Sequence, residues 1–198
     1  MATQTNKDSG EVAAALAPAV LEVVSAIPKP RVRKRRDAQE AARQLAASAA
    51  LKAALAAGSL ALPTGVLGWL ALLPQLRAVW RIQAQLVVDI AALHGHRGPL
   101  TQEQILHCLF QHRTARAMQK LASGMGERLL ATGISGRVLQ LIAQRLALRL
   151  TRAVVGRRMA RLLPLAGAVG IGAYAYFETA RVASTATALF QQQTKARR

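Results

Sequence analysis

Two carboxylates stand among apolar residues that we predict to be helical, and both could in principle do chemistry. Asp89 lies between Val88 and Ile90, and Glu178 follows a long uncharged run. Catalysis by paired carboxylates would need two such groups to converge. An ionised Asp89 in apolar surroundings must instead find a cation or hydrogen-bond donors, so we expect a structural partner such as an arginine on another helix. Glu178 is expected to pair with Arg181, three residues further on.

Cys108 and His112 have the i, i+4 spacing that places two metal ligands on one helix face, and His94 or His96 could add a third from a loop. No second close pair of ligands accompanies them, so the sequence predicts neither a metal site nor a cofactor. The motifs G-x-x-x-x-G-K-[ST], H-E-x-x-H and G-x-S-x-G are absent from the sequence. We therefore expect a protein that is not an enzyme. A metalloprotein or enzyme centred on Asp89, Cys108 and His112 is a weaker hypothesis than binding to anionic lipid or to nucleic acid, which the charge of the chain favours.

The charge of the chain indicates a polyanionic partner. Lysine and arginine number 27 against 9 acidic residues, which gives a net charge of +18 over 198 residues. Anionic lipid and nucleic acid are the two candidates. The hydrophobic fraction of 52% favours lipid, and the aromatic fraction of 4% offers few of the rings on which single-strand binders stack bases.

The basic residues fall into three groups, which are a cluster in "RVRKRR", a helical stripe and one face of a later helix. Their simplest interpretation is a solvated surface, but clusters of four to eight cations are also typical of segments that bind anionic lipid. We expect contacts with anionic lipid or phosphate from Arg31, Arg33, Lys34, Arg35, Arg36, Arg113, Arg116, Lys120, Arg145, Arg149 and Arg152.

The elements that must position these groups are helices, because no useful length of sequence alternates with period two. The predicted fold is all-α, a compact multi-helix bundle with two Gly/Ala-rich apolar helical hairpins. Residues 1–36 are expected to be a disordered basic tail, within which "EVAAALAPAVLEVVSAI" could form a short helix that docks on a membrane or on the domain. Residues 37–190 form the domain, and 191–198 a basic C-terminal tail.

Capping patterns place the predicted helices. Asp37 and Glu40 have capping-box spacing before an Ala-rich helix that ends at Gly58. A second helix follows Arg77, and Gly95 ends it. Thr101 and Gln104 open a third. A long basic helix over 136–163 meets Pro164, which ends or kinks it before the last helix.

A run of 24 residues without a charge, 53–76, is long enough to span a bilayer. Pro63, Thr64 and Gly65 divide it into two arms, each too short to cross, so we expect a hairpin turn at these residues that keeps both ends on one side. A second uncharged run, 162–177, carries small residues at i, i+4, including Ala168 and Gly172, which permit close helix contact. Hydrophobicity cannot distinguish shallow insertion into a membrane from burial in a soluble core.

Two segments resemble the EcsC family of bacterial helical proteins. The first, "LPTGVLGWLALLPQLRAVWRIQAQLVVDIAALHG", is similar to the family's Pro-Gly turn, apolar helix and Gln-rich segment, with His94 where the family usually has tyrosine. The second, "LLPLAGAVGIGAYAYFETARVA", is similar to its Pro-x-x-Gly-Ala segment. The resemblance covers about residues 45–190 and implies a helical fold near a membrane, without a reaction.

Together these observations predict a non-enzymatic scaffold or accessory protein on the cytoplasmic side of the bacterial inner membrane. It would bind anionic membrane lipid through its basic residues and its apolar hairpin, as a peripheral or shallowly inserted protein. A protein partner stays open, and no small-molecule substrate is evident. The alternative is a soluble helical protein that binds nucleic acid without reading its sequence.

Overall fold

The computed structural model describes residues 2–58, 73–96, 98–110, 140, 143, 144 and 157–196. Its regular structure in these ranges is entirely helical, which confirms the predicted all-α fold. The helices are α1 (Ala2–Ser25), α2 (Ala38–Gly58), α4 (Leu73–Leu93), a short helix over 102–110, and α8 (Arg157–Ala196).

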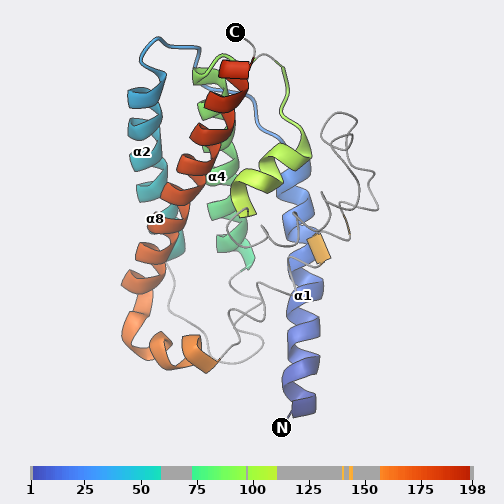
Figure 1. Ribbon diagram of the computed structural model, residues 1–198. Coiled ribbons are helices and arrows are strands. Elements are labelled where there is room, and N and C mark those ends of the chain that lie inside the picture. Colours follow the sequence, from blue (N-terminus) through green and yellow to red (C-terminus); the bar gives the residue numbers. More distant parts are fainter. Residues whose placement is uncertain are drawn as a thin grey trace.

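Three of these helices, α2, α4 and α8, pack side by side, and α1 lies along α4 (Figure 1). The chain climbs through α1, crosses one end of the bundle in residues 26–37, descends through α2 and returns through α4, so α2 and α4 are antiparallel. The first turns of α8, in orange, lie at a large angle to the rest of that helix, which contains Pro164. The bundle thus has a loop end, where residues 26–37 cross, and an opposite end, where α2 stops and α4 starts.

Small side chains let α2 and α8 approach closely. Ala50 and Ala53 of α2 are almost completely buried. A Cβ atom at Gly172 of α8 would lie 3.0 Å from the backbone oxygen of Ala54, which leaves no room for a larger residue. The small-residue spacing in the second uncharged run therefore serves close helix contact, as the sequence predicts.

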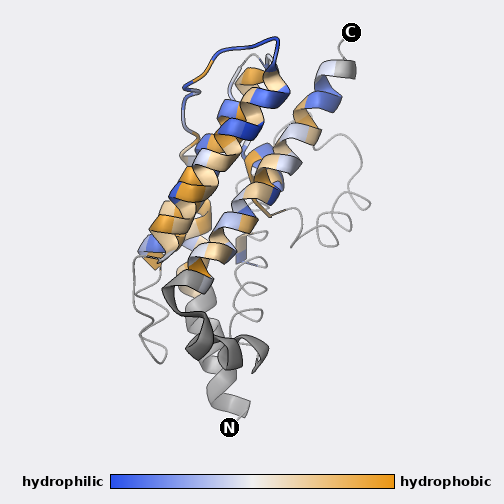
Figure 2. Cartoon of the chain, turned by 90° about the vertical axis from the view of Figure 1, so that its left-hand side faces the viewer, coloured by the Kyte–Doolittle hydropathy of each residue, from blue (hydrophilic) through white to orange (hydrophobic). Residues whose placement is uncertain are grey.

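The apolar periodicity of α4 points into the core. Five apolar side chains recur at helical spacing in α4, of which Ile82 is half-buried and the other four are buried: Val79, Leu86, Ile90 and Leu93. Figure 2, which faces α2, shows that helix beginning with polar residues beside the loop and continuing with mainly apolar ones.

Two of the predicted caps are present, at the end of α4 and at the start of the short helix. The capping box predicted at the start of α2 is not formed, because the Asp37 carboxylate bonds to Arg35 and the Glu40 carboxylate to Arg43 and Gln44. Gly95 has a φ of 79°, its N–H donates to the carbonyl of Ala92, and the N–H of His96 donates to that of Ala91. This pair of bonds is a Schellman motif, and it ends α4. Thr101 and Gln104 exchange side-chain-to-backbone hydrogen bonds of 2.9 and 3.3 Å, which is the predicted capping box.

The structure differs from the expected disordered tail over 1–36. Residues Ala2–Ser25 form α1, because an apolar stripe in the segment packs into the main core through Leu16, Val20, Val23 and Val24. Of the two docking partners considered for this segment, the domain is the one that the structure shows. At the other terminus α8 continues to Ala196, beyond the expected domain end at residue 190.

The 24-residue uncharged run starts inside α2 and ends inside α4, and these helices are antiparallel neighbours. The chain therefore reverses direction between Gly58 and Leu73, and both flanks lie at the same end of the bundle. The expected turn residues Pro63, Thr64 and Gly65 lie outside the described residues. Within the described part of the chain, no helix combines the length and the hydropathy that a membrane crossing requires.

Candidate functional site

The basic cluster lies on a loop that is fixed to α4 by its backbone. The N–H of Arg31 donates a 2.7 Å hydrogen bond to Asp89 Oδ1, and the N–H of Arg35 donates a 3.4 Å bond to the carbonyl of Leu93. The Nε2 group of Gln85 donates to the carbonyl of Lys29 at 3.0 Å. Three points of attachment thus hold residues 29–35 across the end of the helix.

Asp89 is the central acceptor of this attachment. Its carboxylate is 6% exposed, and Oδ1 also accepts a 3.1 Å bond from Gln85, one helical turn earlier. The expected structural partner is present, but it is a backbone amide and not an arginine side chain. A carboxylate that accepts two hydrogen bonds from donors of its own fold has a structural role in holding the loop.

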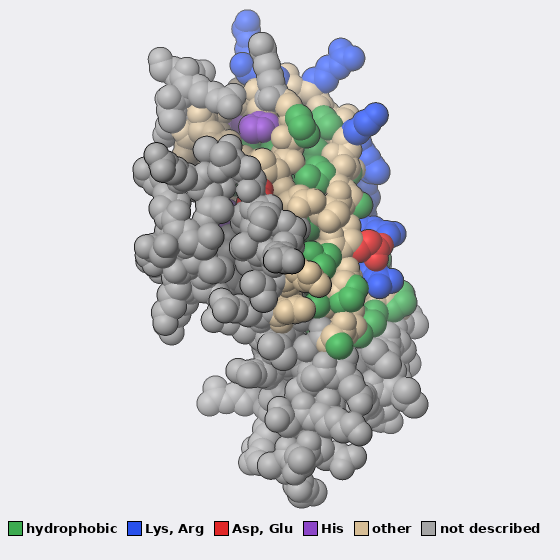
Figure 3. All heavy atoms as spheres, turned by 90° about the vertical axis from the view of Figure 1, so that its right-hand side faces the viewer, with side chains coloured by type: hydrophobic (Ala, Val, Ile, Leu, Met, Phe, Trp, Pro, Cys, Tyr) green, Lys and Arg blue, Asp and Glu red, His purple; other side chains and the backbone are tan. Residues whose placement is uncertain are grey.

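Basic side chains of the fixed loop reach the surface, whereas Val32 packs against the core and Arg31 borders a pocket. Figure 3 shows lysine and arginine side chains projecting from the loop end of the molecule. Arg35 donates bonds of 2.9 and 2.8 Å to both oxygens of Asp37, and this hydrogen bonding lowers the pKa of Asp37. The remaining cations of the cluster are exposed and form no ion pair with another described residue: Arg31, Arg33, Lys34 and Arg36.

Other acidic residues of the described chain already have arginine partners. Glu22 of α1 contacts Arg77 and Arg81 of α4, Glu40 contacts Arg43, and Glu178 contacts Arg181 at 3.5 Å. The pair between Glu178 and Arg181 is the one that their spacing predicts. Apart from Arg35, which pairs with Asp37, the cations of the loop therefore form no ion pair with an acidic side chain of the described residues.

An open pocket lies beside the loop attachment and was not predicted. It has a volume of about 400 Å³ and is bounded by α2, α4 and the start of the loop. Arg31, Lys52 and Arg81 line it together with apolar side chains. In the sequence these cations are far apart, and only the antiparallel pairing of α2 with α4 brings them to one place.

A set of exposed apolar side chains was also missed. Leu51 and Leu55 of α2 are 57% and 68% exposed, and Phe177 of α8 is 64% exposed. Tyr174 and Tyr176, which precede Phe177 in α8, are exposed as well. We call these five residues the apolar flank. All lie within about one and a half turns of the contact between Gly172 and Ala54, so the flank spans two packed helices.

The remaining predicted positions are not brought together by the described structure. Arg113, Arg116, Lys120, Arg145, Arg149, Arg152 and His112 lie outside the described residues. Cys108 is buried, and desolvation raises the pKa of its thiol to about 12. Within the described ranges, no three histidine, cysteine or acidic side chains lie close enough together to hold a metal ion.

No family model matches the chain, and neither the curated proteins nor the solved structures contain a match to it. The resemblance to the EcsC family thus rests on the two sequence segments alone.

Proposed function

We propose that the protein is a non-enzymatic scaffold or accessory protein that lies on the anionic, cytoplasmic face of a bacterial inner membrane. The observation that carries this proposal is the apolar flank, because large exposed apolar side chains beside a cation, here Lys52, that forms no ion pair with another described residue are characteristic of surfaces that meet lipid. Tyrosine, which is amphipathic, is well suited to the boundary between headgroups and acyl chains. Membership of the EcsC family is part of the proposal and fits a membrane-proximal helical domain.

The fold restricts how the molecule can sit on a membrane. The basic loop is at one end of α2, and the rest of the uncharged run follows its other end, at Gly58. A helix of 21 residues is about 30 Å long. A bundle standing upright could therefore bring only one of the two parts to a flat bilayer. With α2 along the surface, the loop cations can reach it together with Leu51 and Leu55.

The test is flotation of the full chain with liposomes of varied anionic content. We expect recovery to rise with anionic lipid and to fall with salt. Arg33→Gln combined with Arg36→Gln should weaken partitioning by about 30-fold at low salt, since each cation near an anionic surface contributes about 1 kcal/mol. Glu40→Gln combined with Arg43→Gln is the control, because it replaces two charged side chains of one ion pair and leaves the net charge unchanged.

The apolar contribution is tested separately. Leu51→Ser combined with Leu55→Ser should reduce binding without changing its dependence on salt, because neither substitution alters charge. Equal recovery on neutral and anionic vesicles would remove the electrostatic part of the proposal. If the chain binds no vesicles at low salt but binds duplex DNA with an affinity that falls steeply with salt, nucleic acid is the partner instead of lipid.

A further inference from the structure

The pocket beside the loop has the composition of a binding site for an anion. Its lining includes three cations, Arg31, Lys52 and Arg81, and a single carboxylate, Asp89. The Asp89 oxygen that faces the loop is already used by the amide of Arg31 and by Gln85. The charge balance of the pocket therefore favours a negatively charged ligand.

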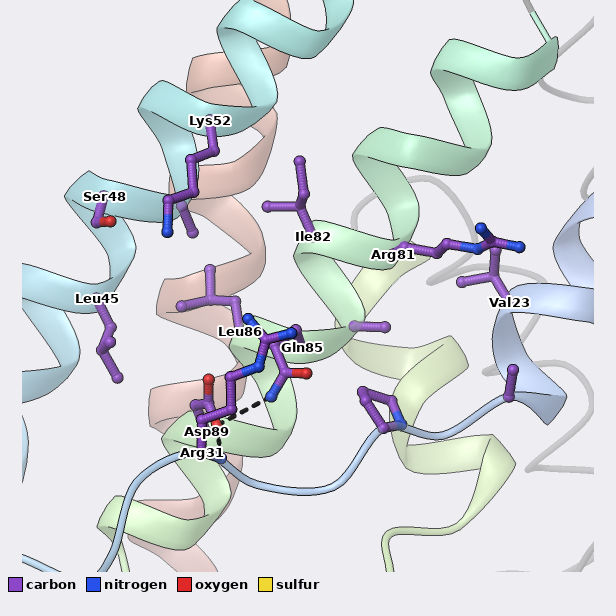
Figure 4. Close-up of a pocket in the computed structure, with 14 residues that line it drawn as sticks. Val23, Arg31, Leu45, Ser48, Lys52, Arg81, Ile82, Gln85, Leu86 and Asp89 are labelled. Carbon is purple, nitrogen blue, oxygen red and sulfur yellow. Dashed lines mark hydrogen bonds between the residues drawn. The ribbon is translucent and has the colours of Figure 1, made fainter.

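Two of the three cations are available to such a ligand. Figure 4 shows the Arg81 side chain turned toward α1, where its guanidinium contacts Glu22. Lys52 and Arg31 instead point from opposite sides toward the space around Leu86. Neither side chain forms an ion pair with another described residue. The hydroxyl of Ser48, one turn before Lys52 on α2, also lines this space.

Part of the pocket lining is apolar. Leu45 of α2 and Ile82 and Leu86 of α4 form this part, and Ile82 remains half-buried although the other apolar positions of α4 are buried. A free phosphate would leave these apolar side chains in contact with water. A volume of about 400 Å³ accommodates a phosphate together with a short hydrocarbon portion.

We infer that the pocket binds the phosphate headgroup of one anionic phospholipid, with Lys52 and Arg31 on the phosphate and Ile82 and Leu86 against the first methylenes. A membrane lipid, and not a free phosphate, is the expected ligand because of the neighbouring residues on α2. Ser48 and Lys52, which line the pocket, lie within one turn of the exposed Leu51 and Leu55, respectively. The inference deepens the proposed function and rests on it, since that function brings α2 to the bilayer.

The test uses the full chain and a water-soluble lipid, dihexanoyl phosphatidic acid, below its micellar concentration. Isothermal titration calorimetry should show saturable binding of one lipid per chain. Lys52→Gln should weaken the affinity by about fivefold, and the double variant with Arg31→Gln by about tenfold or more. Arg43→Gln, on the same helix but outside the pocket, should change it by less than twofold. Circular dichroism checks that each variant is folded.

Two further measurements distinguish a lipid phosphate from free phosphate, and the pocket proposal from the proposal of membrane binding. Inorganic phosphate should bind at least tenfold more weakly than the lipid, and equal affinities would overturn the lipid assignment. Absence of saturable lipid binding, or equal losses in Lys52→Gln and Arg43→Gln, would also overturn it. If vesicles still bind the wild-type chain in that case, only the pocket fails. If the soluble lipid binds through Lys52 but vesicles do not, the pocket stands and the proposed function fails.

Discussion

Replacing Asp89 by alanine tests the idea that this carboxylate exists to hold the basic loop. The substitution removes the acceptor of the 2.7 Å bond from the Arg31 amide and of the 3.1 Å bond from Gln85. Hydrogen bonds to charged groups contribute about 1.5–3 kcal/mol each, but the Gln85 amide can still bond to Lys29. We therefore expect the free energy of unfolding to fall by about 2–3 kcal/mol. Asp89→Asn, which keeps an oxygen in place, should cost about 1 kcal/mol.

Urea unfolding followed by circular dichroism measures these losses, and amide hydrogen exchange at Arg31 reports the loop directly. Glu40→Ala is the control, because it makes the same charge change in a chain of net charge +18 but breaks only exposed contacts with Arg43 and Gln44, which should cost about 0.5 kcal/mol. A loss below 0.5 kcal/mol in Asp89→Ala, or unchanged protection of the Arg31 amide, would refute the structural role.

Three further predictions concern the core. Gly172→Ala should lower the free energy of unfolding measured in urea by about 1 kcal/mol, although alanine is favoured over glycine by about 1 kcal/mol in a helix interior, because the new Cβ meets the Ala54 backbone oxygen at 3.0 Å. Ala180→Gly on the exposed face of the same helix calibrates that propensity, and a gain of about 1 kcal/mol in Gly172→Ala would contradict the close contact. Burial raises the pKa of the Cys108 thiol from 9.0 to about 12, so this thiol should resist alkylation at pH 8 until the chain is unfolded. Equal labelling rates in the folded and unfolded states would contradict its burial. Burial lowers the pKa of His107 below 6.5, so this histidine takes up a proton in the unfolded state at a higher pH than in the folded state. The free energy of unfolding should therefore fall as the pH drops below about 6.5, and His107→Gln should remove this part of its pH dependence.

Local patterns in the sequence were sufficient for α4 and its end and for the start of the short helix over 102–110. The apolar period of α4, the glycine that ends it at Gly95 and the capping box at Thr101 depend on residues within a turn or two of each other, so they can be predicted without a tertiary fold. The same holds for the pairing of Glu178 with Arg181 and for the all-helical class. Composition likewise determined the excess of positive charge.

Only the tertiary structure decided which helices and loops contact one another. The segment that becomes α1 contains Pro18 and precedes a run of cations, and only the groove along α4 gives its apolar stripe a place to be buried. Asp89 is separated from Arg31 by 58 positions, and no spacing rule relates a carboxylate to a distant backbone amide. The pocket, too, exists because two antiparallel helices place Lys52 opposite Arg81. Contacts between residues far apart in the sequence depend on how all the helices of the bundle pack against one another, and no local pattern encodes that packing.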